Sequence, residues 1–150
     1  MLFRSPDILR NGEDRAHRLY GTEENSAKYV AKPGEEIIYR FDKSDVKSVH
    51  VVFDSDLNRS TLDGSVCERT HTTRANVKLD APMMHLPTTL CKSFTLYGEL
   101  NGERCELLCV DLNRKRSYHV NVNKCFDTLA LIPNESWGGE NIPIVSFDFE

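Results

Sequence analysis

The sequence of 150 residues contains no apolar run that approaches the ~18 residues of a membrane-spanning helix. Its first residues, MLFRSPDILRNGEDR, lack the long apolar core of a secretory signal. It also lacks an excess of positive charge, since 19 Lys and Arg stand against 23 Asp and Glu for a net charge of −4. Phosphate backbones are bound by basic surfaces, so a nucleic-acid partner is disfavoured. We expect a cytoplasmic protein with neither a membrane nor a nucleic-acid partner.

Motifs for catalysis and cofactor binding are also missing. The sequence has no GxSxG nucleophile motif and neither of the glycine-rich phosphate loops, GxGxxG and GxxxxGK[ST]. Its cysteines form no CxxC pair, and their odd number argues against a complete disulfide framework. We therefore predict a protein without enzymatic activity, in which reduced thiols pack as small hydrophobic groups. The cysteines are Cys67, Cys91, Cys105, Cys109 and Cys125.

The sequence does contain many short β-strand patterns separated by turn signals. No long stretch has a helical apolar period, and Asn101-Gly102 is typical of a two-residue type I′ hairpin turn. The pattern predicts a single all-β domain over residues 1–150, an antiparallel β-sandwich or jelly roll of about eight strands. Residues 1–34 are expected to form a long structured loop region, and 42–47 a turn. The expected strands are 35–41, 48–53, 74–79, 93–100, 104–112, 116–122, 125–132 and 142–149.

The segment after the strand 48–53 begins like a calcium-binding loop, with oxygen ligands at alternate positions: Asp54, Asp56, Asn58 and Ser60. The rest of that motif is absent, because its sixth position is Arg59 instead of Gly and its twelfth is Ser65 instead of Glu. A polar turn fits better, in which the carboxylates cap backbone N–H groups or pair with Arg59.

A second oxygen-rich segment lies near the N-terminus and contains Asn11, Glu13, Asp14, Glu23, Glu24 and Asn25. Calcium is bound by carboxylate and amide oxygens together with backbone carbonyls. Asn11, Asp14 and Glu23 are thus candidate ligands of a structural calcium ion. The alternative is a solvated acidic loop without a metal.

The only tryptophan, Trp137, lies beside two glycines in the segment ESWGGE. An exposed aromatic face suits the C–H surface of a sugar ring, whereas a buried Trp137 would close the end of the sandwich. Arg116 and Tyr118 are two residues apart on an expected strand, so they point to one face. They would line a polar groove there or cover the outer face of the sheet.

Several segments resemble, in matching order, the C-terminal region of bacterial FAD-dependent oxidoreductases. VVFDSDLNR resembles a signature of that region, and NGEDR resembles its N-x-x-x-R opening. The segments LCKSFTLYGELNGE, NRKR and TLALIPNESWGGENIPIVSFDFE resemble its hairpin, the start of the following strand and its closing pair of strands. The resemblance covers nearly the whole chain, although the Trp of many relatives is replaced by Asn25-Ser26-Ala27.

This resemblance implies a galactose-binding-like (discoidin-like) β-sandwich that serves as a non-catalytic accessory domain. FAD would bind only to an upstream domain of the same protein, which would be the partner of this one. The alternative is a carbohydrate-binding module that acts through loops at one end of the sandwich. A hydrolase is disfavoured, because no pair of carboxylates can be assigned the separation of about 5–9.5 Å that glycoside hydrolysis requires. The candidate ligand-binding residues are Asp54, Asp56, Asn58, Arg59, Arg116, Tyr118 and Trp137.

Overall fold

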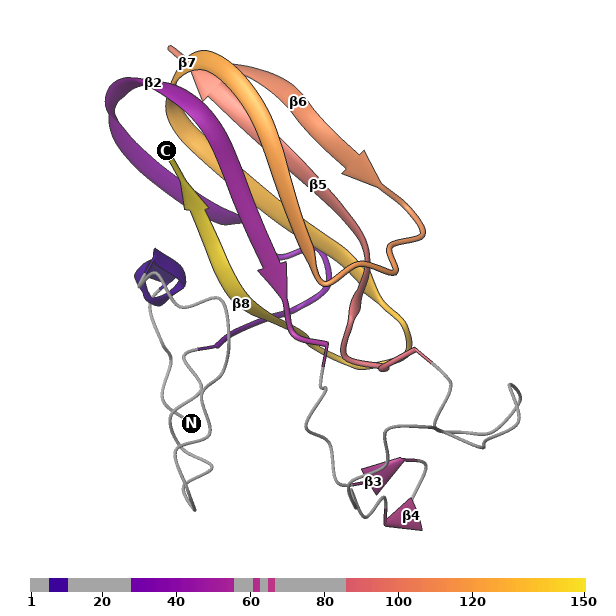
Figure 1. The fold of residues 1–150 in the computed structure, drawn as a ribbon. Helices are drawn as coiled ribbons and strands as arrows, with labels where there is room; N and C mark the ends of the chain where they lie inside the picture. Colours follow the sequence, from indigo (N-terminus) through magenta and orange to yellow (C-terminus); the bar gives the residue numbers. More distant parts are fainter. Residues whose placement is uncertain (1–5, 11–27, 56–60, 63–64, 67–85) are drawn as a thin grey trace.

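The structure, a computed structural model, describes residues 6–10, 28–55, 61–62, 65–66 and 86–150. These residues form β-strands apart from one short 3-10 helix (Figure 1). Within the described ranges no helix is long and apolar enough to cross a membrane. The elements are η1 (Pro6–Arg10), β1 (Tyr29–Ala31), β2 (Ile37–Phe53), β3 (Thr61–Leu62), β4 (Ser65–Val66), β5 (Cys91–Leu100), β6 (Glu103–Val110), β7 (Ser117–Ser136) and β8 (Ile142–Phe149).

Six strands form one antiparallel sheet in the order β1-β8-β2-β7-β5-β6, while β3 pairs with β4 separately. The sheet folds over on itself because β2 and β7 are long and curved (Figure 1). In one layer, the first part of β2 pairs with the second part of β7. The second part of β7 also pairs with β5, and β5 pairs with β6. The second part of β2 pairs with the first part of β7 and with β8. The predicted all-β antiparallel sandwich is therefore confirmed.

The long strand β2 corrects the prediction of two strands separated by a turn at 42–47. The chain stays in the ladder through this segment, and the register shifts between Arg40 and Ser44 and again between Val46 and Ser48. Extra residues in one strand bend it and increase its twist. The polar residues 42–45 are exposed at the bend, which explains their resemblance to a turn in the sequence.

The strand β7 likewise joins two segments that were predicted as separate strands, 116–122 and 125–132. Two residues of β7, Val122 and Asn123, face the single residue Lys47 of β2. Asn123 has a φ of 52°, a conformation that asparagine adopts more readily than most residues. The apparent break in the sequence is therefore a bulge at which the sheet turns from one layer to the other.

Other predicted elements agree closely with the structure. The predicted strands 93–100, 104–112 and 142–149 correspond to β5, β6 and β8. The turn between β5 and β6 has positive φ values at Asn101 (53°) and Gly102 (84°), as a type I′ turn requires. Two short elements, η1 and β1, lie inside the region 1–34 that was expected to be loop. The predicted strand 74–79 lies outside the described residues.

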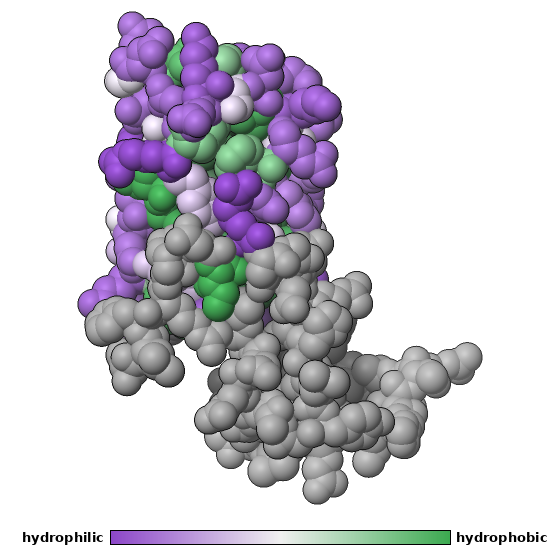
Figure 2. Space-filling model, turned by 90° about the vertical axis from the view of Figure 1, so that its left-hand side faces the viewer, coloured by the Kyte–Doolittle hydropathy of each residue, from purple (hydrophilic) through white to green (hydrophobic). Residues whose placement is uncertain are grey.

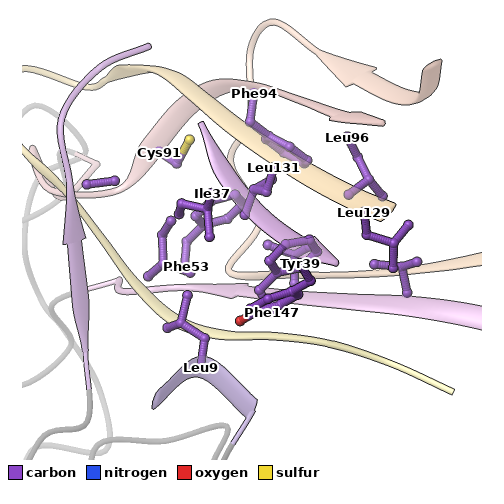
Figure 3. Packing of buried hydrophobic residues seen from close by; sticks show 14 of the residues in the cluster. Leu9, Ile37, Tyr39, Phe53, Cys91, Phe94, Leu96, Leu129, Leu131 and Phe147 are labelled. Atoms are coloured by element: carbon purple, nitrogen blue, oxygen red, sulfur yellow. The ribbon is translucent and has the colours of Figure 1, made fainter. Parts of the chain in front are cut away.

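The core lies between the two layers and is built from aliphatic and aromatic side chains of both (Figure 3). Phe53, Phe94 and Phe147 are among its largest fully buried side chains. Leu9 of η1 is also fully buried and points toward this cluster. On the face of the molecule seen in Figure 2, apolar residues are visible only as small areas among hydrophilic ones. The core reaches one end of the sandwich through the rings of Phe53, Phe94 and Tyr118.

Candidate ligand-binding site

The structure brings the end of β2 and the Trp137 segment to the same end of the sandwich. The N–H of Asp54 donates to the carbonyl of Pro143 (3.0 Å), while the N–H of Trp137 donates to that of Leu90 (3.1 Å). The rings of Phe53 and Phe94 connect the two layers between these points, with centroids 4.9 Å apart. We call this end the loop end and define it by residues 54–55, 87–90, 111–116 and 137–141 (Figure 1).

A single buried amide, Asn113, organises the loop end. Its exposed fraction is 1%, so its polar atoms need partners within the protein. The side-chain Nδ2 donates to the carbonyl of Cys91 (2.8 Å). The side-chain Oδ1 accepts from the backbone N–H of Lys115 (2.6 Å) and from the hydroxyl of Tyr118 (2.9 Å). One side chain thereby ties the turn after β6 to the starts of β5 and β7.

The backbone of Asn113 adds two further hydrogen bonds. Its N–H donates to the carbonyl of Lys92 (2.7 Å), and its carbonyl accepts from the indole Nε1 of Trp137 (2.7 Å). Trp137 is half-buried and packs against the edge of the core. Its ring is therefore fixed along one edge, and an aromatic group held in this way loses little freedom when a ligand binds.

Tyr118 packs toward the core, contrary to the alternative that it covers the outer face of the sheet with Arg116. Its ring meets that of Phe94 edge-on, with centroids 5.0 Å apart. The reason is that Tyr118 pairs with Val51, whose buried side chain lies on the core side of β2. Burial raises the pKa of the Tyr118 hydroxyl, and a smaller contribution comes from the neighbouring Cys91 side chain. The hydroxyl therefore stays protonated and donates to Asn113.

Two lysines lie near the aromatic rings of the loop end. The Nζ of Lys92 is 5.8 Å from the ring centre of Trp137, and that of Lys115 is 5.7 Å from the ring centre of Tyr118. Both distances are within the range of cation–π attraction. Lys92 also pairs with Glu135 at 2.7 Å. The aromatic groups thus lie in surroundings that carry local positive charge.

Asp54 directly follows β2 and forms an ion pair with Lys28 at 2.6 Å. Both side chains are largely buried, with exposed fractions of 16% and 25%. Arg116 is half-buried directly before β7, and its carbonyl accepts from the N–H of Phe53 (2.8 Å). The sequence had suggested Arg59 or backbone N–H groups as partners of the carboxylate, and it gave no sign of Lys28, which is 26 residues away.

The remaining candidates lie outside the described residues, namely the ligand-binding candidates Asp56, Asn58 and Arg59 and the metal candidates Asn11, Asp14 and Glu23. In the part of the chain that the structure describes, no group of three or more His, Cys, Asp or Glu is arranged to hold a metal ion. The structure thus unites Asp54, Arg116, Tyr118 and Trp137 at one end. It also adds Asn113, of which the sequence showed only a turn-forming asparagine.

No protein-family model and no curated protein matches this sequence. Solved structures do share its fold at low identity. The chain resembles GH31 CBM32-2 bound to GalNAc, with a TM-score of 0.61, 14% identity and coverage of 95% of this chain and 85% of that one. It resembles the family 32 carbohydrate-binding module of Streptococcus pneumoniae EndoD, with a TM-score of 0.61, 13% identity and coverage of 96% and 83%.

A third structure is the module CpGH89CBM32-4 of Clostridium perfringens in complex with glcNAc-alpha-1,4-galactose. Its TM-score is 0.58 at 10% identity, with coverage of 98% of this chain and 81% of that one. These likenesses show the galactose-binding-like β-sandwich fold that the sequence resemblance implied. They do not bear on the flavin-dependent parent protein that the same resemblance implied.

Proposed function

We propose that this chain is a non-catalytic module that binds carbohydrate at the loop end. The observation that carries the proposal is the position of Trp137, which is half-buried and held by its Nε1 on the carbonyl of Asn113. A fixed aromatic ring with a partly exposed surface suits the apolar C–H face of a sugar. Arg116 and Asp54 supply polar groups near the same end, where a ligand's hydroxyl groups would need partners.

The fold supports this proposal, because the similar solved modules include one bound to GalNAc and one in complex with a disaccharide. Asp56, Asn58 and Arg59 directly follow Asp54 in the sequence. We keep them as candidate ligand-binding residues.

Trp137 is the only tryptophan, so its fluorescence reports directly on the site. Titration with a panel of monosaccharides and disaccharides is expected to change the emission with a saturable dependence for at least one sugar. Trp137→Phe keeps an aromatic ring but loses the indole N–H, so we expect weaker binding, measured by calorimetry. Tyr97→Phe, on β5, is the matched control and should bind as the unaltered chain does. A folded chain that responds to no sugar would contradict the proposal.

A second candidate function is that of the accessory domain of a flavin-dependent oxidoreductase. It is favoured because segments that carry the sequence resemblance, VVFD, NRKR and NESWGG, meet at the loop end. In this case the loop end would contact the upstream flavin domain. The isolated chain should be colourless and should bind that domain when both are mixed. A yellow preparation with one flavin per chain would contradict the assignment of the flavin to the upstream domain.

A further inference from the structure

The turn after β6 contains three consecutive cationic residues, Arg114, Lys115 and Arg116, in a chain whose net charge is −4. From this turn we infer, on the basis of the proposed function, that the loop end selects a sugar bearing a carboxylate over its neutral counterpart. The ligand class would be that of uronic acids and related acidic sugars.

Hydrogen bonds of Asn113 fix the backbone of this turn next to the aromatic groups. The carbonyl that accepts the indole Nε1 of Trp137 belongs to the peptide that joins Asn113 to Arg114. The N–H of Lys115 is bound by the Asn113 side chain at 2.6 Å, and its ammonium lies 5.7 Å from the ring centre of Tyr118. The two charges are thus carried by a fixed turn that directly adjoins the proposed sugar platform.

Other cations at this end already have partners. Lys28 pairs with Asp54 at 2.6 Å, and Lys92 pairs with Glu135 at 2.7 Å. Within the described ranges, by contrast, no carboxylate forms an ion pair with Arg114 or Lys115, and both residues are exposed.

Two acidic residues, Asp111 and Glu140, are exposed at or next to this end, but neither forms an ion pair with Arg114 or Lys115. Their negative charge reduces the local positive potential without satisfying the hydrogen-bond donors of the two cations. These donors therefore remain available to the carboxylate of a ligand. Arginine binds a carboxylate through two parallel N–H···O bonds.

The expected preference is moderate, because the charges are exposed. Opposite charges at an exposed surface attract each other weakly, because water screens them. Allowing for the lost hydration of the carboxylate, we expect an acidic sugar to bind about tenfold more tightly than its neutral counterpart at low salt. Added salt should reduce this ratio toward one, because it screens exposed charges.

The test uses pairs of sugars that differ only in one group, such as galactose with galacturonic acid and glucose with glucuronic acid. Binding is followed through Trp137 fluorescence at low and high salt, for the unaltered chain and for Arg114→Gln/Lys115→Gln. The double variant should retain its affinity for the neutral sugar and lose the tenfold preference. Lys47→Gln/Lys124→Gln, which removes two exposed charges at the bend between β2 and β7, should keep the preference.

Equal affinity for both members of a pair, or a preference that survives in Arg114→Gln/Lys115→Gln, would overturn the inference and leave the proposed function intact. Binding of no sugar by the folded chain would instead overturn the proposed function, and this inference with it. Circular dichroism of each variant separates lost binding from lost fold, because all four substituted side chains are exposed. In a variant that fails to fold, the single substitution Lys115→Gln replaces the pair.

Discussion

The two ends of β5 are held together in different ways. At its start, in the loop end, the buried amide of Asn113 makes hydrogen bonds to Cys91 and Tyr118. At its other end, about 30 Å away for ten extended residues, the hairpin of β5 and β6 is exposed (Figure 1). There Arg104 forms ion pairs with Glu36 (2.8 Å) and Glu99 (3.4 Å).

This difference indicates which end is suited to hold a ligand. Hydrogen bonds to a buried amide are shielded from water. Loss of such a bond leaves a buried polar group unsatisfied, which lowers the stability of the fold. Exposed ion pairs are screened by salt and contribute little. The loop end is therefore the more rigid of the two, although it is built from loops, and the hairpin end depends mainly on its turn geometry.

The largest expected contrast concerns thiol reactivity. Burial raises the pKa of the Cys91 thiol from 9.0 to about 12, and the side chain is fully buried beside Asn113. The thiolate is the reactive form of cysteine. At pH 8 the thiolate fraction of Cys91 should be about a thousandfold below that of an ordinary cysteine. In single-cysteine variants, we expect Cys91 to react with a disulfide reagent only after unfolding, whereas Cys109, exposed on β6, reacts in the native protein. Equal rates would show that the loop end opens readily.

Removal of the central amide should have the next largest effect. Asn113→Ala deletes three side-chain hydrogen bonds, each worth about 0.5–1.5 kcal/mol, and leaves the Cys91 carbonyl and the Tyr118 hydroxyl without this partner. We expect the free energy of unfolding to fall by about 2–4 kcal/mol, measured by urea denaturation. Asn121→Ala, at an exposed position of β7, should change it by less than about 0.5 kcal/mol. Similar losses in both variants would remove the special role of Asn113.

The ion pairs of the hairpin end should matter less. Arg104 has an exposed fraction of 39%, so Arg104→Ala is expected to lower the free energy of unfolding by about 0–1 kcal/mol. The same urea experiment at high salt should reduce this difference further, because salt screens the charges. A loss as large as that of Asn113→Ala would mean that the two ends are equally well fixed.

The smallest expected effect comes from an acid-sensitive hydrogen bond at the hairpin, which the carboxylate of Asp127 accepts. The pKa of Asp127 is lowered, first by the backbone N–H of Asn101, which donates to its carboxylate at 2.8 Å, and then by the hydroxyl of Thr128. A lowered pKa means that this contact stabilises the fold above the ordinary pKa of an aspartate and is lost as the pH falls through the lowered value. Amide exchange at Asn101 should therefore become faster in acid, and Asp127→Asn should remove that pH dependence. A flat profile in the unaltered chain would contradict the contact.

The loop end responds at the opposite pH extreme. Burial raises the pKa of both Cys91 and Tyr118, so the folded state holds these protons more tightly than the unfolded chain. Their contribution to stability is complete below the ordinary pKa values and is lost as the pH rises from those values through the raised ones. The two ends thus differ in the sign of their pH dependence as well as in their contacts.

Much of the fold could be predicted from local sequence. The predicted strand 142–149 and the Asn101-Gly102 turn agree with β8 and with the hairpin, because alternating side chains and positive-φ residues act over a few positions. The breaks predicted inside β2 and β7 were wrong. A bulge presents polar residues to solvent as a turn does, and only pairing with the neighbouring strand distinguishes the two.

The candidate site was predictable only in part. Trp137 could be selected because it is the only tryptophan, and Asp54 because it ends an apolar strand. The inward orientation of Tyr118 was missed, since it depends on pairing with Val51 on a strand more than 60 residues earlier. Asn113 could have been noticed as a turn-forming residue, but nothing near it in the sequence indicates that it becomes buried.

The sequence by itself determined the class of the fold and the chemistry available at its surface: β-strand patterns, a hairpin turn, one tryptophan and a cationic turn in an acidic chain. Only the tertiary structure decided which of these meet. At the loop end, residues 54, 91 and 137 meet the segment 113–118, although these four parts of the sequence are distant from one another. The physical reason is that Asn113 satisfies its polar atoms only through partners that the folded sheet brings to it, so its burial and the site form together.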